Sequence, residues 1–247
     1  MTDIHTHILP GVDDGAEDIK ESLQLLRHAE EEGIRRVVTT PHVYNISDMM
    51  QREKIENAFN QLKEAALMEN IRITLIWGAE LMIDYRIISE IEMLHYYTIN
   101  REGRFVLLEL PMHEIPPYTQ SVIYELMLEG VTPIIAHPER NASIIMNHEK
   151  LEELLLKGAM AQLNAGSLLG EYGNKVRKTS ELLLKKGYIS FIGSDVHSYS
   201  KNRGPMLNAA DIMSKFISDD EIEKIFHSNT DRMVESKHIL NRSSAVN

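Results

Sequence analysis

The chain has 247 residues, of which 43% are hydrophobic and 26% are charged, and its formal net charge is −11. These proportions are typical of a folded globular protein and do not indicate disorder. The acidic balance disfavours non-specific binding to nucleic acid or to an anionic membrane, because both attract basic surfaces. The absence of cysteine excludes disulfides, thiolate metal ligands and a cysteine nucleophile.

No targeting or membrane segment is indicated. The first residues include neither a basic segment nor an apolar run, and no stretch approaches the roughly 20 apolar residues of a membrane span. We therefore expect a cytoplasmic protein without direct membrane insertion. Because no linker, low-complexity segment or repeat divides the sequence, we predict one domain over residues 1–247.

Apolar runs alternate along the chain with segments of helical periodicity. We predict strands at residues 4–9, 35–40, 71–77, 105–108, 132–136, 159–163 and 188–192. Helices are predicted at residues 17–32, 47–69 (with Ser47 as N-cap), 116–129, 148–157 and 175–186, a short helical piece at 84–93, and closing helices at 205–217 and 219–226. Seven strand-then-helix units predict an α/β fold with a closed or nearly closed parallel barrel, one unit short of the usual eight.

Two histidines, His5 and His7, are separated by one residue on the first predicted strand. Side chains alternate along a strand, so both imidazoles point to the same side and could bind one metal ion. Such a pair is weak evidence alone, because short motifs match by chance. The neighbouring Asp3 is expected either to support a metal ligand without touching the metal itself or to have a structural role.

Further imidazoles and carboxylates fall where the predicted strands end. They are His42 on the second strand, Glu80 on the third, Glu109 on the fourth, His137 on the fifth, and Asp195 and His197 on the seventh. Any one of them alone is more often an ordinary polar loop residue, but the carboxyl ends of parallel strands meet on one face of a barrel. The set exceeds the needs of one metal and predicts a polynuclear centre whose nitrogen and oxygen ligands suit manganese, iron or zinc.

Two other polar features accompany these strand ends. Asp13 and Asp14 precede Gly15 and could simply form a turn, although Asp14 is the better candidate for a metal ligand. Arg140 follows the fifth strand and could bind phosphate oxygens as a planar fork, or form a surface salt bridge. A bound metal lowers the pKa of water from about 16 to about 7, which would provide a nucleophile at neutral pH.

Four segments carry a resemblance to a known family: DIHTHILPGVDDGA, TTPH, AHPERN and GSDVHS. They resemble the polymerase and histidinol phosphatase (PHP) superfamily and, more closely, the manganese-dependent protein-tyrosine phosphatases of bacterial capsule and exopolysaccharide operons, the CpsB/CapC type. The resemblance extends over residues 3–203. It implies a distorted seven-stranded barrel of the TIM type with a trinuclear metal site.

The resemblance also implies roles for individual residues. Three divalent ions, most often Mn²⁺ with Fe or Zn as alternatives, would be held by His5, His7 and Asp195, by His137 and Glu109 with Glu80 bridging, and by His42, His197 and Asp14. Arg140 and His42 are the implied catalytic residues, and Arg140 would contact the substrate phosphate. A second phosphate-binding residue is implied further along, where Arg203 lies one residue beyond the expected position and Lys201 is nearby.

The implied substrate is phosphotyrosine on an autophosphorylated, membrane-associated bacterial tyrosine kinase that would recruit the enzyme to the membrane. Its phenolate leaving group has a conjugate acid with a pKa near 10, so no dedicated general acid is needed. The main alternative is a small-molecule phosphatase of the same superfamily, acting for example on histidinol phosphate. A C–N hydrolase is disfavoured because Glu109 occupies the place of the lysine used there, and a non-catalytic metal-binding module because the ligand set is complete.

Overall fold

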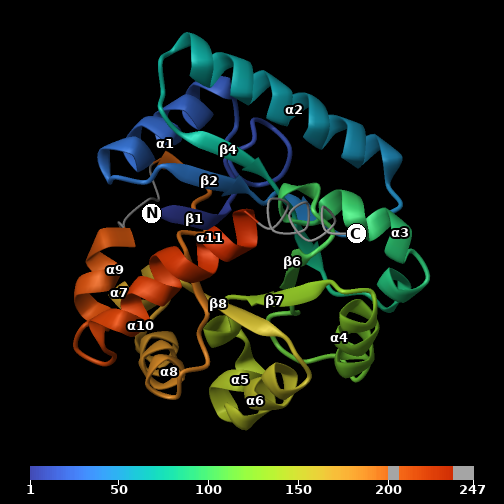
Figure 1. Cartoon of the computed structure of the whole chain (residues 1–247), viewed down its shortest axis with the longest axis vertical. Helices are drawn as coiled ribbons and strands as arrows, with labels where there is room; N and C mark the ends of the chain where they lie inside the picture. The colour runs from blue at the N-terminus through green and yellow to red at the C-terminus, as the bar shows by residue number, and fades with distance from the viewer. Residues whose placement is uncertain (200–205, 236–247) are drawn as a thin grey trace, which may run out of the picture.

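Parallel strands with helices packed around them form the fold of the computed structural model, which describes residues 1–199 and 206–235 (Figure 1). The strands are β1 (Thr2–Thr6), β2 (Arg36–Thr39), β3 (His42–Val43), β4 (Thr74–Trp77), β5 (Glu80–Met82), β6 (Phe105–Glu109), β7 (Thr132–Ala136), β8 (Met160–Asn164) and β9 (Phe191–Gly193). They form two sheets, of order β1-β2-β4 and β3-β5-β6-β7-β8-β9, in which every neighbouring pair is parallel.

The described part of the chain has nine strands: seven overlap the predicted ones, and β3 and β5 are two short additional strands that were not predicted. β2 ends before Pro41, as predicted, because proline lacks the N–H that a continuing strand would use, and β3 begins after it. β4 likewise ends before Gly78, where an added Cβ would lie only 2.7 Å from Cγ1 of Val38, and β5 begins after it. Each of the seven predicted strands therefore has a counterpart, and the prediction missed β3 and β5. His42 is the first residue of β3, and Glu80 is the first residue of β5.

The end of β1 is held by hydrogen bonds on both of its sides. On one side, the N–H of Thr40 donates to the carbonyl of Thr6 at 2.9 Å. On the other, the N–H of Asp195 donates to the carbonyl of His5, and the N–H of His7 donates to the carbonyl of Val196, both at 2.9 Å. The first strand and the segment after the last strand thus lie side by side, although almost 190 residues separate them in the sequence.

Helices cover the outer faces of the strands. They are α1 (Ile19–Glu31), α2 (Met49–Met68), α3 (Ile91–Leu94), α4 (Thr119–Leu128), α5 (Ala142–Met146), α6 (Glu149–Leu156), α7 (Ala165–Leu169), α8 (Asn174–Lys185), α9 (Met206–Met213), α10 (Asp219–Glu223) and α11 (Asn229–Val234). Figure 1 places α1 and α2 beside β2 and β4, and α4 beside β7. The short helices α5 and α7 were not predicted, and the N-cap of α2 is Asp48 instead of Ser47.

Buried apolar side chains from both sheets form a common cluster. It contains Ile4, Val38, Ile76, Leu107, Ile134 and Phe191, each at most 4% exposed. A larger cluster lies between the strands and the helices. Burial on both faces explains the uninterrupted apolar runs of the strands, which are typical of parallel sheets. None of the helices in residues 1–199 and 206–235 is long and apolar enough to cross a membrane.

Candidate metal centre

The imidazoles of His5 and His7 lie on one side of β1, as the alternation of a strand requires. Both side chains are fully buried, and their Nε2 atoms are 3.1 Å apart. Each Nε2 also lies 3.2–3.3 Å from Oε2 of Glu80 and 3.4 Å from Oδ1 of Asp195. Two ring nitrogens and two carboxylate oxygens therefore converge on one small volume.

The Nδ1 atoms of three histidines are bound to acceptors that decide which ring nitrogen remains available. Nδ1 of His5 donates to Oε1 of Gln162 at 3.0 Å, Nδ1 of His7 to Oδ2 of Asp13 at 2.9 Å, and Nδ1 of His197 to the carbonyl of Asp195 at 2.9 Å. Each partner atom can only accept a hydrogen bond, so each Nδ1 carries the proton. The Nε2 lone pair of a neutral ring is then free for a cation, which is the arrangement of metal-binding histidines.

Glu80 is the centre of the group. Its Oε2 lies 3.1–3.3 Å from ring nitrogens of His5, His7 and His42, and its Oε1 lies 3.0 Å from Nε2 of His137. The carboxylate is completely buried. Its Oε2 and Nδ1 of His42 are buried atoms without a hydrogen-bond partner among the described residues, although they are 3.1 Å apart. Two such atoms facing each other fit a shared cation better than they fit each other.

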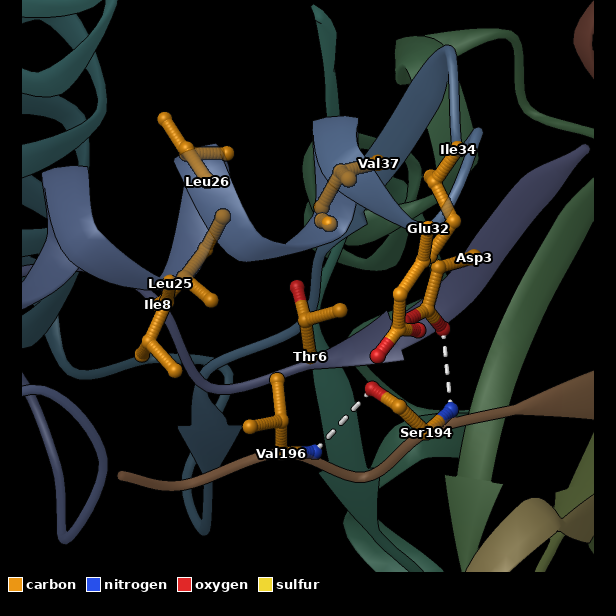
Figure 2. A pocket seen from close by; sticks show the side chains of 11 residues that line it. Asp3, Thr6, Ile8, Leu25, Leu26, Glu32, Ile34, Val37, Ser194 and Val196 are labelled. Carbon is orange, nitrogen blue, oxygen red and sulfur yellow. Dashed lines mark hydrogen bonds between the residues drawn. The ribbon is translucent and has the colours of Figure 1, made fainter. Parts of the chain in front are cut away.

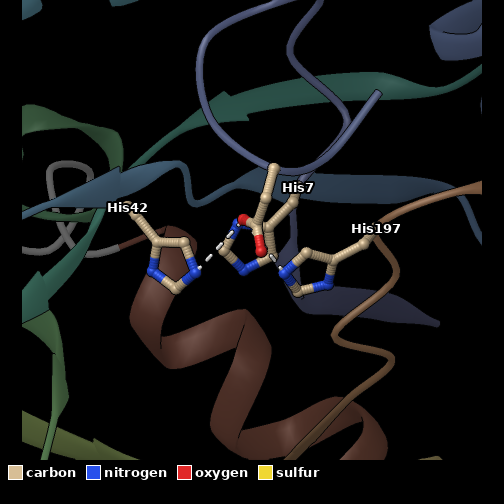
Figure 3. A group of neighbouring side chains, drawn as sticks. His7, His42 and His197 are labelled. Atoms are coloured by element: carbon tan, nitrogen blue, oxygen red, sulfur yellow. Dashed lines mark ion pairs between the residues drawn. The ribbon is translucent and has the colours of Figure 1, made fainter. Parts of the chain in front are cut away.

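Three overlapping sets of side chains have ligand atoms close enough to share an ion. They are His7, Asp14, His42 and His197; His5, His7 and Glu80; and His42, Glu80 and Glu109, with ligand atoms within 4.8 Å of one another in each set. Figure 3 shows His7, His42 and His197 turned toward one another. His7, His42 and Glu80 each belong to two of these sets. His137 and Asp195 belong to none, but they lie within 3.0–3.4 Å of Glu80, His5 and His7.

The protonation states reflect the density of charge in this buried volume. Burial lowers the pKa of His5, but Glu80 and Asp195 outweigh this effect and raise it to about 9. Burial opposes ionisation of Glu80 and Asp195, yet the surrounding imidazoles, first that of His5, hold the pKa of both carboxyls below its usual range. For Glu109, burial and the charge of Glu80 raise the pKa. The protein alone balances its carboxylates with imidazolium protons, a role that divalent cations can take over.

Arg140 lies beside the cluster in the 3₁₀ turn of residues Pro138–Arg140. Its Nη1 donates to Oδ2 of Asp195 at 2.6 Å, and its guanidinium carbon lies 4.5 Å from the ring centroid of Tyr172. The turn is held by the buried Glu139, whose Oε1 accepts from Oγ of Ser167 at 2.6 Å. A guanidinium has five N–H groups, and within residues 1–199 and 206–235 the side chain of Arg140 makes no other hydrogen bond.

Strain in the backbone occurs at two of the candidate ligands. His137 and Asp195 have φ angles of 30° and 55°, in the left-handed region that residues with a Cβ seldom adopt. Such conformations cost about 1–3 kcal/mol each and collect at functional sites. His137 directly follows β7, and Asp195 lies two residues after the end of β9, so an ordinary extended backbone at these positions would direct their side chains elsewhere.

Asp3 has the supporting position that was expected of it. Its Oδ1 accepts from the N–H of Ser194 at 3.0 Å and from the N–H of His5 at 3.3 Å, which ties β1 to the segment that carries Asp195 (Figure 2). Burial raises the pKa of this carboxyl. A small cavity of about 20 Å³ lies next to it, on the side of α1.

Several residues of the site were missed in the sequence. Asp13 was considered only as a turn former, yet it accepts from His7 and from the N–H groups of Gly15 and His42. In β8, for which no ligand was predicted, Gln162 binds His5 and Asn164 donates to Oδ2 of Asp195 at 2.7 Å. Gln162 and Asn164 are polar residues at alternate positions of an otherwise apolar strand, a signal that could have indicated them.

One prediction lies outside the described residues. Arg203 and Lys201, the two candidates for a second phosphate contact, both belong to residues 200–205. Their role stays a prediction.

A buried cluster of imidazoles and carboxylates at the ends of parallel strands defines a candidate metal-dependent hydrolase. The family model for capsular polysaccharide synthesis proteins CpsB/CapC matches residues 1–235. The chain therefore belongs to the CpsB/CapC family. It is 42% identical over 207 residues to a putative tyrosine-protein phosphatase CapC of Staphylococcus aureus, an alignment that covers 84% of this chain and 80% of the relative.

Solved structures agree with this assignment. A structure from work on YwqE of Bacillus subtilis and CpsB of Streptococcus pneumoniae, described as unique metal-dependent tyrosine phosphatases, has a TM-score of 0.87 and 31% identity, and covers 95% of this chain and 94% of its own. A histidinol phosphate phosphatase of Lactococcus lactis has a TM-score of 0.54 and 16% identity, with 87% of this chain and 94% of its own covered. That second similarity shows the fold alone.

Proposed function

We propose that this chain is a metal-dependent protein-tyrosine phosphatase of capsule or exopolysaccharide synthesis. One observation carries the proposal: Nε2 of His5, Nε2 of His7 and Oε2 of Glu80 meet within 3.1–3.3 Å, while acceptors fix the protons of both histidines on Nδ1. This arrangement of ligand atoms supports the binding of a cation. The naming of relatives as tyrosine-protein phosphatases supports the reaction class.

The centre has enough ligands for three divalent ions, and Mn²⁺ is the ion we propose. His5, His7 and Asp195 would hold the first, His137 and Glu109 the second with Glu80 bridging, and His42, His197 and Asp14 the third. The all-nitrogen-and-oxygen donor set fits manganese and also iron or zinc. When bound, these ions would supply Lewis acidity and a water of lowered pKa.

The side chains around the centre have distinct tasks. His42 would hold its ion on the side of the cluster that faces solvent, because its side chain is 14% exposed while those of His5 and Glu80 are fully buried. Arg140 would bind non-bridging phosphate oxygens with the N–H groups that it does not use on Asp195. Its contact with Tyr172 limits the rotation of the guanidinium and so fixes the direction in which its N–H groups point.

The leaving group and the composition agree with phosphotyrosine as the substrate. A phenolate departs with a conjugate-acid pKa near 10, so little protonation is needed in the transition state. Because the chain has no cysteine, a phosphocysteine intermediate is excluded. We propose that the physiological substrate is an autophosphorylated, membrane-associated tyrosine kinase of polysaccharide assembly, as the family assignment suggests.

The same proposal includes the finer description of the fold. We propose that the strands form a distorted seven-stranded barrel and that residues 1–247 are one domain. The hydrogen bonds that link Asp195 and Val196 to β1 support closure, and the apolar cluster shared by the two sheets supports a single core.

The test is hydrolysis of a phosphotyrosine peptide by the Mn²⁺-loaded protein. We expect turnover that EDTA abolishes and that Mn²⁺ restores, and a loss of more than about 100-fold in Glu80→Gln, which keeps the size of the side chain but removes the shared charge. Hydrolysis that a chelator leaves unchanged would contradict the proposal. Faster turnover of histidinol phosphate than of the peptide would favour the small-molecule phosphatase instead.

A further inference from the structure

An aromatic ring stands at the edge of the metal centre without an evident structural task. Tyr44 comes just after the end of β3, two residues beyond His42, and its ring lies beside the imidazole of His42. Their rings are nearly parallel, with centroids 5.6 Å apart and an interplanar angle of 26°. The ring of Tyr44 therefore lies beside the candidate metal ligand His42, on the side of the centre that faces solvent.

The exposure of Tyr44 distinguishes it from tyrosines that stabilise the fold. Its side chain is 58% exposed, and its hydroxyl has no hydrogen-bond partner among the described residues. Tyr97, by contrast, is 1% exposed and donates to the carbonyl of Ile46 at 3.2 Å. Burial and hydrogen bonding thus account for Tyr97, whereas neither explains a large exposed ring at position 44.

The geometry of a bound phosphomonoester would place its substituent near the ring of Tyr44. When Arg140 and the ions hold the three non-bridging oxygens, the ester oxygen and its substituent must point away from the centre. The substituent of phosphotyrosine is a flat ring attached directly to that oxygen, so it remains close to the edge of the site. Aromatic rings attract each other at centroid distances of 4.5–7 Å, and a short aliphatic substituent gains no comparable contact.

We infer that Tyr44 is a specificity-determining residue, which selects aryl over alkyl phosphomonoesters by stacking against the ring of the leaving group. The inference rests on the proposed function, because it assumes that phosphate binds at the metal centre. It concerns recognition, and Tyr44 takes no part in the transfer of the phosphoryl group.

Binding of two non-hydrolysable probes isolates this contact from catalysis. Phenylphosphonate and methylphosphonate share the phosphonate group and differ in the ring, and isothermal titration to the Mn²⁺-loaded protein measures both affinities. We expect Tyr44→Leu to weaken phenylphosphonate about 5-fold while methylphosphonate changes less than about 2-fold. Tyr44→Phe should keep the wild-type preference, because it retains the ring.

A matched control and a metal measurement make the result decisive. Tyr124 of α4 is 56% exposed on an outer helix, so Tyr124→Leu removes a ring of the same exposure and should change neither affinity. The manganese content of Tyr44→Leu should equal that of the wild type. Equal losses for both phosphonates, or no loss for either, would overturn the inference.

Failure of the inference and failure of the proposed function give different results. If the wild type hydrolyses the phosphotyrosine peptide but Tyr44→Leu binds both probes normally, the function stands and the role of Tyr44 is refuted. If the ring preference depends on Tyr44 but the peptide is not hydrolysed, aryl recognition stands and the phosphatase assignment is refuted.

Discussion

Gln162 and His5 are joined by a hydrogen bond of 3.0 Å between the side-chain oxygen of the amide and Nδ1 of the imidazole. The same oxygen accepts from the N–H of His137 at 3.3 Å, and the amide nitrogen donates to Oδ1 of Asn164 at 2.9 Å. A backbone N–H can only donate, so the orientation of the amide is fixed, and with it the tautomer of His5. Gln162, which is not itself a candidate ligand, thus fixes the tautomer of the candidate ligand His5.

Replacing Gln162 by Met should therefore weaken metal binding without removing a ligand. The substitution keeps the approximate volume but leaves Nδ1 of His5 without an acceptor, and loss of such a partner typically lowers metal affinity 10–100-fold, on the order of 1–3 kcal/mol. Titration of the metal-free protein with Mn²⁺ measures the effect. Gln120→Met on the exposed face of α4 is the control, and equal affinities in both variants would refute the role of Gln162.

Replacement of Asp by Asn should lower the stability of the metal-free protein at position 13 but not at position 14. Asp13 accepts from His7, Gly15 and His42, so Asp13→Asn places an amide donor against one of these donors and should lower stability by about 1–3 kcal/mol even without metal. The side chain of Asp14 is 71% exposed, so Asp14→Asn should leave the metal-free protein as stable as the wild type. Chemical denaturation after EDTA treatment measures both. Equal destabilisation of the two variants would contradict a structural role for Asp13 that Asp14 does not share.

The turn after β1 has no space for a side chain at Gly15. A Cβ at position 15 would lie 2.0 Å from the carbonyl oxygen of His7, an atom that also accepts from the N–H of Ala16 at 3.0 Å. The Asp-Gly sequence was interpreted as a turn signal, which is correct but incomplete. In the structure, the turn returns to β1 and brings Asp13 to His7.

The proximity of the candidate strand-end ligands was predictable, because the carboxyl ends of parallel strands lie at the same edge of a sheet. His5, Glu80, His137 and Asp195 each follow from one rule, that the carboxyl ends of parallel strands share a face. The rule does not depend on the exact strand bounds. For this reason the presence of β3 and β5, which were not predicted, displaced none of these residues from the centre.

The residues that support the ligands could not be inferred with the same rule. Gln162 and Asn164 are polar residues in an apolar strand, but whether they contact His5 and Asp195 depends on the order of β8 and β9 in the sheet. Tyr172 reaches Arg140 from the loop after α7, a helix without a periodic signal because it has only five residues. Contacts of this kind depend on tertiary packing, which a single sequence does not specify.

Arg140 should be required for turnover and dispensable for metal binding. In Arg140→Ala, Oδ2 of Asp195 still accepts from Asn164 at 2.7 Å, so the candidate ligand remains oriented. The phosphate loses its guanidinium, and we expect kcat/KM for a phosphotyrosine peptide to fall about 100-fold or more, near 3 kcal/mol. Mass spectrometry of the metal content checks the first part and steady-state kinetics the second. Loss of metal together with activity would show that Arg140 acts mainly by holding Asp195.

Metal removal should begin at the side of the centre that Asp14 faces. The group of Asp14, His42 and His197 includes the exposed Asp14 side chain and two histidines that are 14% and 24% exposed, whereas His5 and Glu80 are fully buried. A chelator and water reach the former more easily, so we expect EDTA to remove manganese in two phases, the faster one comprising about one third of the total. Asp14→Asn should lack the fast phase and keep the slow one. Release in a single phase from the wild type would argue against a third ion that is held less firmly than the other two.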